Sequence, residues 1–179
     1  MSSICSIQYL RSDQSSLSGN CIRQYRYRFG SIGRIDHALF RGNNLIKMHP
    51  HINDEILTYI RSGYVEHIDY EGIIANLDNK KLMLMKAGKI FQHEEEIIDK
   101  GEPLEALQIF IRPKEKDLKP IVTFLDLEND KSENQWRSIA LPSPESPLQF
   151  TSRIIMPDFF FLTEELFFTK FFRFTDRFD

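Results

Sequence analysis

The feature that most constrains this chain is a run of short β-patterned segments, each bounded by a turn signal. In residues 21–30, Tyr25, Tyr27 and Phe29 alternate with polar residues, which is the period-two pattern of a strand with one buried face. Further strand-like segments follow as far as Pro113, which stops the last of them. The turn signals between these segments are Gly42-Asn43-Asn44, Arg61-Ser62-Gly63, Glu71-Gly72, Asp78-Asn79 and Gly88. Short strands at this spacing predict an all-β barrel or sandwich.

Length and charge limit the class of protein. The 179 residues suffice for one ordinary domain, or for one domain and a fragment. The net charge of −3 is spread along the chain without a basic stripe, which disfavours direct nucleic-acid binding. Two cysteines, Cys5 and Cys21, without a signal-peptide pattern predict a cytoplasmic protein. No apolar stretch is long enough to span a membrane, so we expect no membrane-spanning segment.

The last third of the chain has a different composition. Residues 114–147 hold many charges and four prolines, which predicts a connector lying over a surface rather than a second core. Nine of the fifteen phenylalanines fall in residues 159–179. We expect this Phe-rich tail to pack on the barrel as a helix or strand pair, or to form a homodimer contact, because exposed apolar patches of this size rarely stay free. A membrane-surface segment is the other alternative. In the helical alternative, one face carries Phe167, Phe168, Phe171 and Phe172.

Two pairs of residues carry the strongest chemical signal: His49 with His51, and His93 with Glu95. On a strand, residues i and i+2 face the same side, so the two members of each pair can point into a barrel together. Pro50 lacks a backbone donor and therefore suits a strand edge or a bulge. Two neighbouring strands of this kind would present three imidazoles and one carboxylate to a single ion. This set of nitrogen and oxygen ligands suits iron, and also zinc, copper, nickel or manganese.

The residues around these pairs resemble the signature of the pirin family. His49-Pro50-His51 leads to Glu55, two apolar residues, Thr58 and Tyr59, as the family's His-Pro-His leads to Glu, two apolar residues, Thr and Tyr. The resemblance covers roughly residues 20–155. Its further matches are Gly63, Glu66-His67-Ile68-Asp69, Gly72, Met85-Lys86-Ala87-Gly88, His93-Glu94-Glu95 and Leu107-Gln108-Ile109-Phe110, with a looser match at Trp136-Arg137-Ser138-Ile139-Ala140 and Ser143-Pro144.

This resemblance implies a cupin double-stranded β-helix, or jelly-roll barrel, with Fe(II) in the N-terminal barrel of a two-barrel protein. His49, His51, His93 and Glu95 fall on the family's metal-ligand positions. Some members open flavonols such as quercetin with dioxygen, while others act as nuclear cofactors or regulators of enzymes. The resemblance thus implies a metal-dependent dioxygenase for a small aromatic substrate, with Glu95 as ligand or general base. The alternatives are a non-enzymatic metal- or redox-sensing regulator that binds a protein partner, and a half-protein that keeps the metal site without activity.

The chain departs from the family pattern in two ways that matter. Ile52-Asn53-Asp54 stands where the family usually has Arg-Gly-Phe, so the loop lining the site differs and the substrate stays open. The chain also has room for only one complete barrel. We expect that barrel over residues 20–113, with its linker reaching about residue 135, and a remnant of the second cupin domain plus the Phe-rich tail over 136–179.

Several other residues have competing interpretations. Glu55 occupies a position where cupins often place a carboxylate ligand, and it can alternatively orient a ligand imidazole as a hydrogen-bond partner. His67 is as much a candidate for a strand residue at the barrel surface as for a functional one. The residues expected to be purely structural or solvated are His37, Glu94, Glu96, Tyr59 and Phe91, the last two as core or pocket wall.

Overall fold

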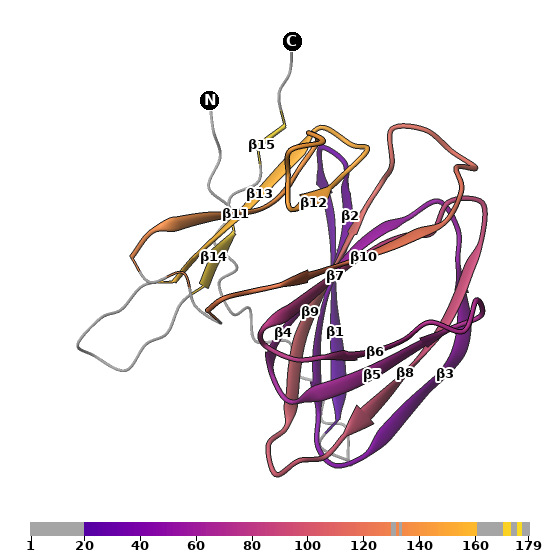
Figure 1. The fold of residues 1–179 in the computed structure, drawn as a ribbon, viewed down its shortest axis with the longest axis vertical. Coiled ribbons are helices and arrows are strands. Elements are labelled where there is room, and N and C mark those ends of the chain that lie inside the picture. Colours follow the sequence, from indigo (N-terminus) through magenta and orange to yellow (C-terminus); the bar gives the residue numbers. More distant parts are fainter. Residues whose placement is uncertain (1–19, 130–131, 133, 161–169, 173–174, 177–179) are drawn as a thin grey trace.

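The computed structural model describes residues 20–129, 132, 134–160, 170–172 and 175–176, and within these ranges every regular element is a β-strand (Figure 1). The prediction of an all-β fold is therefore confirmed. Among the described residues, no helix has the length and apolar character needed to cross a membrane.

Two antiparallel sheets form the main body. The six-stranded sheet has the order β1-β2-β9-β4-β7-β10, and the four-stranded sheet has the order β3-β8-β5-β6. The strands of the six-stranded sheet are β1 (Cys21–Phe29), β2 (Ile32–Phe40), β9 (Leu104–Ile111), β4 (Glu55–Ser62), β7 (Lys81–Lys86) and β10 (Ile121–Asp126). Those of the four-stranded sheet are β3 (Asn44–His51), β8 (Phe91–Ile98), β5 (Tyr64–Asp69) and β6 (Ile74–Leu77).

The two sheets enclose the barrel core between them. Along β4 and β7, Ile56, Ile60, Met83 and Met85 point inward, where they meet apolar residues of the four-stranded sheet. The inward-facing partners from β5, β6 and β8 are Val65, Leu77, Phe91 and Ile97. The alternation that the sequence predicted for β8 is confirmed, because Phe91, His93, Glu95 and Ile97 are buried while Gln92 and Glu96 are exposed and Glu94 is half-buried.

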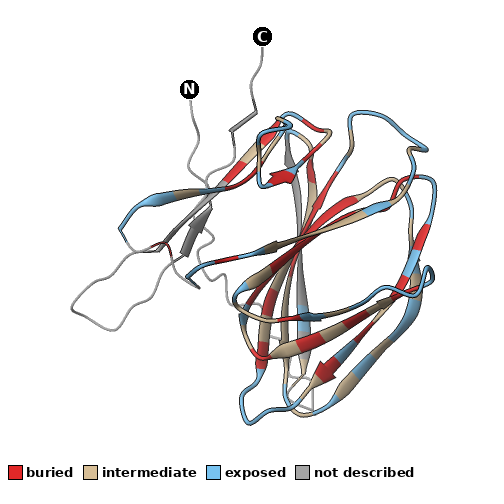
Figure 2. Cartoon of the chain, in the orientation of Figure 1, coloured by how far each residue is buried: buried red, intermediate tan, exposed pale blue. Residues whose placement is uncertain are grey.

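The six-stranded sheet is buried on its other face as well. There Leu57 and Tyr59 of β4 and Leu82 and Leu84 of β7 pack against a C-terminal sheet of order β12-β11-β13-β14, with β15 paired to β13. Figure 2 shows the resulting concentration of buried residues along the strands that cross the centre of the molecule. The C-terminal strands are β11 (Trp136–Leu141), β12 (Leu148–Gln149), β13 (Ile154–Phe160), β14 (Lys170–Phe172) and β15 (Thr175–Asp176).

The segment predicted as a connector is more structured than its composition suggested. Within residues 114–147, β10 pairs with β7 and closes one edge of the six-stranded sheet, with Val122 and Phe124 packed on the barrel core. In the tail, β13 and β14 form an antiparallel pair, so a strand pair replaces the helical alternative for Phe171 and Phe172. Phe167 and Phe168 lie outside the described residues. The homodimer contact, and the division into a barrel over 20–113 and a second-domain remnant from 136, stay predictions.

Candidate metal centre

The site begins with the pairing of β3 and β8, which are adjacent antiparallel strands. His49 lies directly opposite His93, and the register between these strands shifts between Ile46 and His49. Pro50 is tolerated because β3 forms the edge of the four-stranded sheet, as its missing donor predicted. The i, i+2 spacing of His49 and His51 places both rings beside the ring of His93.

Three of the four predicted ligands converge. The ring centroids of His49 and His93 are 4.6 Å apart, those of His49 and His51 are 4.8 Å apart, and those of His51 and His93 are 5.1 Å apart. One nitrogen of each ring can serve as ligand atom, and the three ligand atoms lie within 4.8 Å of one another. His93 is buried, while the other two rings are half-buried. A set of this kind fits a divalent metal that needs one open side for a reactant.

Hydrogen bonds assign a ligand nitrogen in two of the rings. His49 Nδ1 donates to the carbonyl oxygen of Lys47 at 2.9 Å, which leaves its Nε2 free. His93 Nδ1 lies 3.1 Å from Nδ1 of His67, and its Nε2 is buried without a hydrogen-bond partner. Buried polar atoms are normally satisfied, so an orphaned imidazole nitrogen at this place fits a metal ligand.

The local environment favours the neutral form of His93 and His51, as metal binding requires. Burial lowers the pKa of His93 to about 2, with further lowering by positive charge on His49, His67 and His51. Burial also lowers the pKa of His51 to about 4, helped by His49 and by Arg34. The Arg34 guanidinium lies 3.7 Å from the ring centroid of Phe110, whose centroid is 5.9 Å from that of His51.

Glu95 lies on the same face of β8 as His93 and is 6% exposed. Gln108 Nε2, from β9 of the opposite sheet, donates to Glu95 Oε1 at 2.8 Å. Burial raises the pKa of Glu95 to about 7, against the lowering effect of the Gln108 hydrogen bond. Among the residues that the structure describes, the converged group comprises the three histidines, so Glu95 as fourth ligand stays a prediction. Sequence patterns alone do not identify Gln108 as a site residue, although it stands between apolar residues in the middle of β9.

His67 lies inside the barrel rather than at its surface. It is fully buried on β5, with its ring centroid 5.0 Å from that of His93. Burial lowers the pKa of His67, while the neighbouring Asp69 carboxylate raises it. The surface alternative is therefore wrong for this residue.

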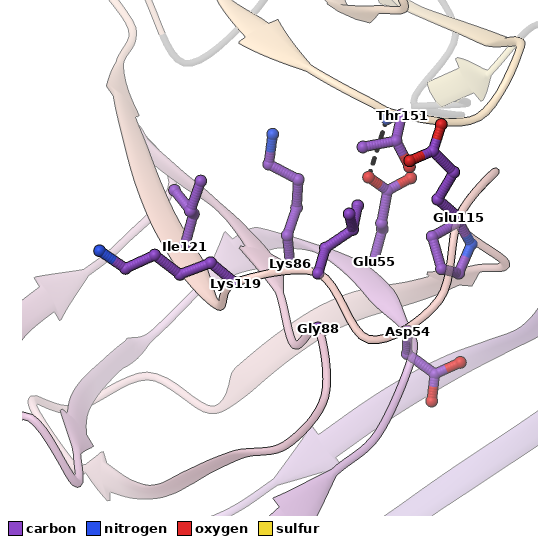
Figure 3. Close-up of a pocket in the computed structure, with 10 residues that line it drawn as sticks. Asp54, Glu55, Lys86, Gly88, Glu115, Lys119, Ile121 and Thr151 are labelled. Carbon is purple, nitrogen blue, oxygen red and sulfur yellow. Dashed lines mark hydrogen bonds between the residues drawn. The ribbon is translucent and has the colours of Figure 1, made fainter.

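Glu55 faces away from the histidines. Its neighbour Ile56 points into the barrel, so Glu55 lies on the outer face of β4, where its Oε1 accepts a hydrogen bond from the backbone N–H of Thr151 at 2.8 Å. Its Oε2 accepts a longer one, at 3.4 Å, from the N–H of Ser152. Figure 3 shows Glu55 beside Thr151, with Lys86 nearby. These three residues are among those that line an open cavity of about 220 Å³. Glu55 is thus neither ligand nor partner of a ligand; it joins the barrel to the C-terminal segment.

His37 has the structural role expected of it. Its Nε2 donates to Glu105 Oε1 at 3.1 Å, and Arg61 Nη1 also reaches this carboxylate, 3.0 Å from Oε2. The three residues come from β2, β9 and β4, so the contact ties neighbouring strands together.

Replacing Glu105 with glutamine is expected to lower the free energy of unfolding at pH 7 by about 1 kcal/mol. The His37 hydrogen bond holds the pKa of Glu105 below its usual value, with Arg61 acting in the same direction and burial opposing it. A carboxyl whose pKa is lowered by folding stabilises the fold above its unfolded pKa of about 4.3 and loses that contribution as pH falls through its folded value. Urea denaturation of both proteins between pH 7 and pH 3 should show the difference shrinking with acid; a constant difference would contradict this account.

Comparison with known proteins adds the family context. The family model described as Pirin matches residues 14–111. A relative from Pasteurella multocida is 31% identical over 114 residues, which are 64% of this chain and 49% of the relative. The quercetin 2,3-dioxygenase of Escherichia coli K12 is 38% identical over 92 residues, covering 51% of this chain and 40% of that enzyme. The chain thus spans about half the length, or less, of the curated relatives it matches.

Solved structures agree on the fold. The crystal structure of YhhW from Escherichia coli superposes with a TM-score of 0.74 at 20% identity, covering 84% of this chain and 68% of that one. The nickel(II) complex of the bacterial pirin YhhW gives a TM-score of 0.68 at 24% identity, covering 76% of this chain and 58% of that one. At these identities the likeness concerns architecture alone, and it supports the predicted cupin-type barrel.

Proposed function

The chain belongs to the pirin family, and we propose that it holds a divalent metal through His49, His51, His93 and Glu95 and acts as a dioxygenase on flavonol-type substrates. The observation that carries this proposal is the convergence of three imidazole nitrogens within 4.8 Å, contributed by two strands of the region that matches the family.

Fe(II) is the metal we propose, with zinc, copper, nickel and manganese as the other ions that this donor set accepts. Three neutral imidazoles and one carboxylate would occupy four positions of an octahedral ion and leave two for reactants. Glu95 enters the set from the same strand face as His93, two residues further along β8. The nickel in the YhhW complex belongs to that protein and is consistent with a divalent ion here.

When bound, the ion would supply Lewis acidity that lowers the pKa of a flavonol hydroxyl and a place for dioxygen to react. The chain itself would move the proton: Glu95, on the same strand face as His93, would accept it from the substrate hydroxyl and release it later. Gln108 would hold Glu95 Oε1 in place during this transfer, since it donates to that oxygen. The Phe110 ring, under the Arg34 guanidinium and beside His51, offers an aromatic wall for a planar substrate.

Aerobic incubation of the Fe(II)-loaded protein with quercetin is expected to remove the flavonol absorbance, while anaerobic incubation leaves it intact. The His37→Ala protein serves as matched control, because His37 lies outside the converged group and should leave turnover unchanged. Metal-loaded protein that consumes no flavonol from a panel of substrates would reject the dioxygenase. The metal-dependent regulator would then be the better interpretation, tested by metal-dependent capture of a protein partner.

A further inference from the structure

Strand β5 places two buried polar residues directly behind the metal strand. It lies next to β8 in the four-stranded sheet, with His67 opposite Glu95 and Asp69 opposite His93. The side chains of His67 and Asp69 are both fully buried, which is unusual for polar groups unless they are paired. The His67 ring is confined between Phe91, stacked at 6.4 Å, and Phe124, edge-on at 6.4 Å between centroids.

Asp69 is fixed by the backbone that follows β5. Its Oδ1 accepts hydrogen bonds from the backbone N–H groups of Glu71 and Ile73, each at 2.9 Å. Its Oδ2 lies 3.9 Å from His67 Nε2, and neither of these two buried atoms has a hydrogen-bond partner. Two buried polar atoms without hydrogen-bond partners lower the stability of the fold. A purely structural role therefore does not explain why His67 and Asp69 are placed here.

The direction of the hydrogen bonds follows from the chemistry of imidazole. A neutral ring carries one N–H, so if His93 Nε2 keeps its lone pair for a metal, His93 Nδ1 must carry the proton. His93 Nδ1 then donates across 3.1 Å to His67 Nδ1, which has to act as acceptor. The proton of His67 is thereby placed on Nε2, the atom that faces Asp69 Oδ2. In this order the His67 Nε2–H faces the Asp69 carboxylate as an electrostatic contact, since 3.9 Å is too long for a hydrogen bond.

We propose that His67, with the Asp69 carboxylate facing its Nε2–H, orients His93 through the Nδ1···Nδ1 hydrogen bond and fixes it as the Nδ1–H tautomer, which makes His67 a positioning residue of the metal centre. The proposal rests on the proposed metal-binding function. Residues behind a ligand imidazole set its tautomer and ring orientation, and their loss typically costs about 10–100-fold in metal affinity. Here the residue directly behind the ligand is a second histidine, and the carboxylate stands one residue further back.

Two variants of His67 separate positioning from packing. His67→Leu fills the space without an acceptor, so Co(II) binding, followed by its visible absorption bands, should weaken about 10–100-fold. His67→Asn offers its Oδ1 near the position of the imidazole Nδ1, and it should restore most of the affinity. His37→Leu is the matched control, a histidine also paired with a carboxylate but outside the converged group, and should leave Co(II) affinity unchanged.

A metal-free readout tests the tautomer directly. Long-range 1H–15N correlation spectra of the metal-free wild-type protein should show the His93 ring protonated on Nδ1, a state kept in His67→Asn and lost in His67→Leu. An Nε2–H tautomer of His93 in the wild type, or equal Co(II) affinity of His67→Leu and wild type, would overturn the proposal. If the wild type binds no Co(II), the proposed metal-binding function fails. The tautomer of His93 in the metal-free protein then tests by itself whether His67 orients His93. If His67→Leu does not fold, the proposal is tested by the His93 tautomer of the wild type and by the Co(II) affinity of His67→Asn.

Discussion

Replacing His93 with alanine will abolish tight divalent-metal binding, lowering affinity by more than about 100-fold, the upper end of what loss of a residue behind a ligand costs. His93 is the buried member of the converged group, and it alone joins the two histidines of β3 to the residues behind them on β5. The two half-buried imidazoles of β3 and the proposed ligand Glu95 would remain, but the ion would lose the buried imidazole of the converged group. Metal analysis of purified protein, stripped with chelator and reloaded with Fe(II) or Ni(II), measures the loss.

The same substitution leaves His67 Nδ1 buried without its partner, which is expected to cost about 1–3 kcal/mol of stability. Unfolding of the metal-free proteins should therefore be measured alongside, so that lost metal is not confused with lost fold. His37→Ala provides the comparison, since it also removes a histidine from a carboxylate contact but should keep its metal. A folded His93→Ala protein that retains stoichiometric metal would show that the ion is held elsewhere.

Replacing Gly88 with alanine is expected to lower the free energy of unfolding by about 4 kcal/mol, an exceptional value for a single substitution. Gly88 lies in the turn between β7 and β8 at φ +53°, a conformation that costs L-residues about 1–2 kcal/mol. An added Cβ would lie 2.1 Å from the carbonyl oxygen of Leu118 and 2.9 Å from its carbonyl carbon. These are backbone atoms that cannot rotate away. The turn is also held from the other side, because the N–H of Asn53 donates to the Gly88 carbonyl oxygen at 2.8 Å.

Gly42→Ala is the matched control for this effect. Gly42 also has a positive φ, +72°, but a Cβ there would meet nothing within 4 Å, so only the backbone cost of about 1–2 kcal/mol should appear. Urea denaturation of the two variants and the wild type gives both values. If the two alanine variants are equally destabilised, the contact with Leu118 is not what constrains Gly88.

Much of the barrel and three of its candidate ligands could be predicted from the sequence because both follow from local patterns. Alternation on β8 and the two-residue spacing on β3 determine which side chains share a face without knowledge of the partner strand. What alternation could not decide was the orientation of Glu55. Residues 55–60 of β4 are all buried, so neither face of the strand is distinguished by polarity, and Glu55 proved to lie on the outer one.

The sequence also could not predict the roles of residues that depend on contact with a distant strand. Gln108 meets Glu95 across the barrel, and His67 meets His93 only because β5 pairs with β8. Neither contact leaves a spacing signal in the sequence. The strand β10 was hidden in the same way, since its apolar residues stand between charged and proline-containing stretches and become a strand by pairing with β7.

The two-sided burial of the six-stranded sheet bears on how this chain can be divided. The stretch that matches the family ends at residue 111, yet one whole side of its central strands is shielded by residues that come later. Cutting the chain after Pro113 would bring Leu57, Tyr59, Leu82 and Leu84 into contact with water and would take from Glu55 the amide groups it binds. Such a fragment would expose a large apolar surface and is expected to aggregate. We therefore expect the histidine-bearing half to need its C-terminal strands in order to stay folded and monodisperse.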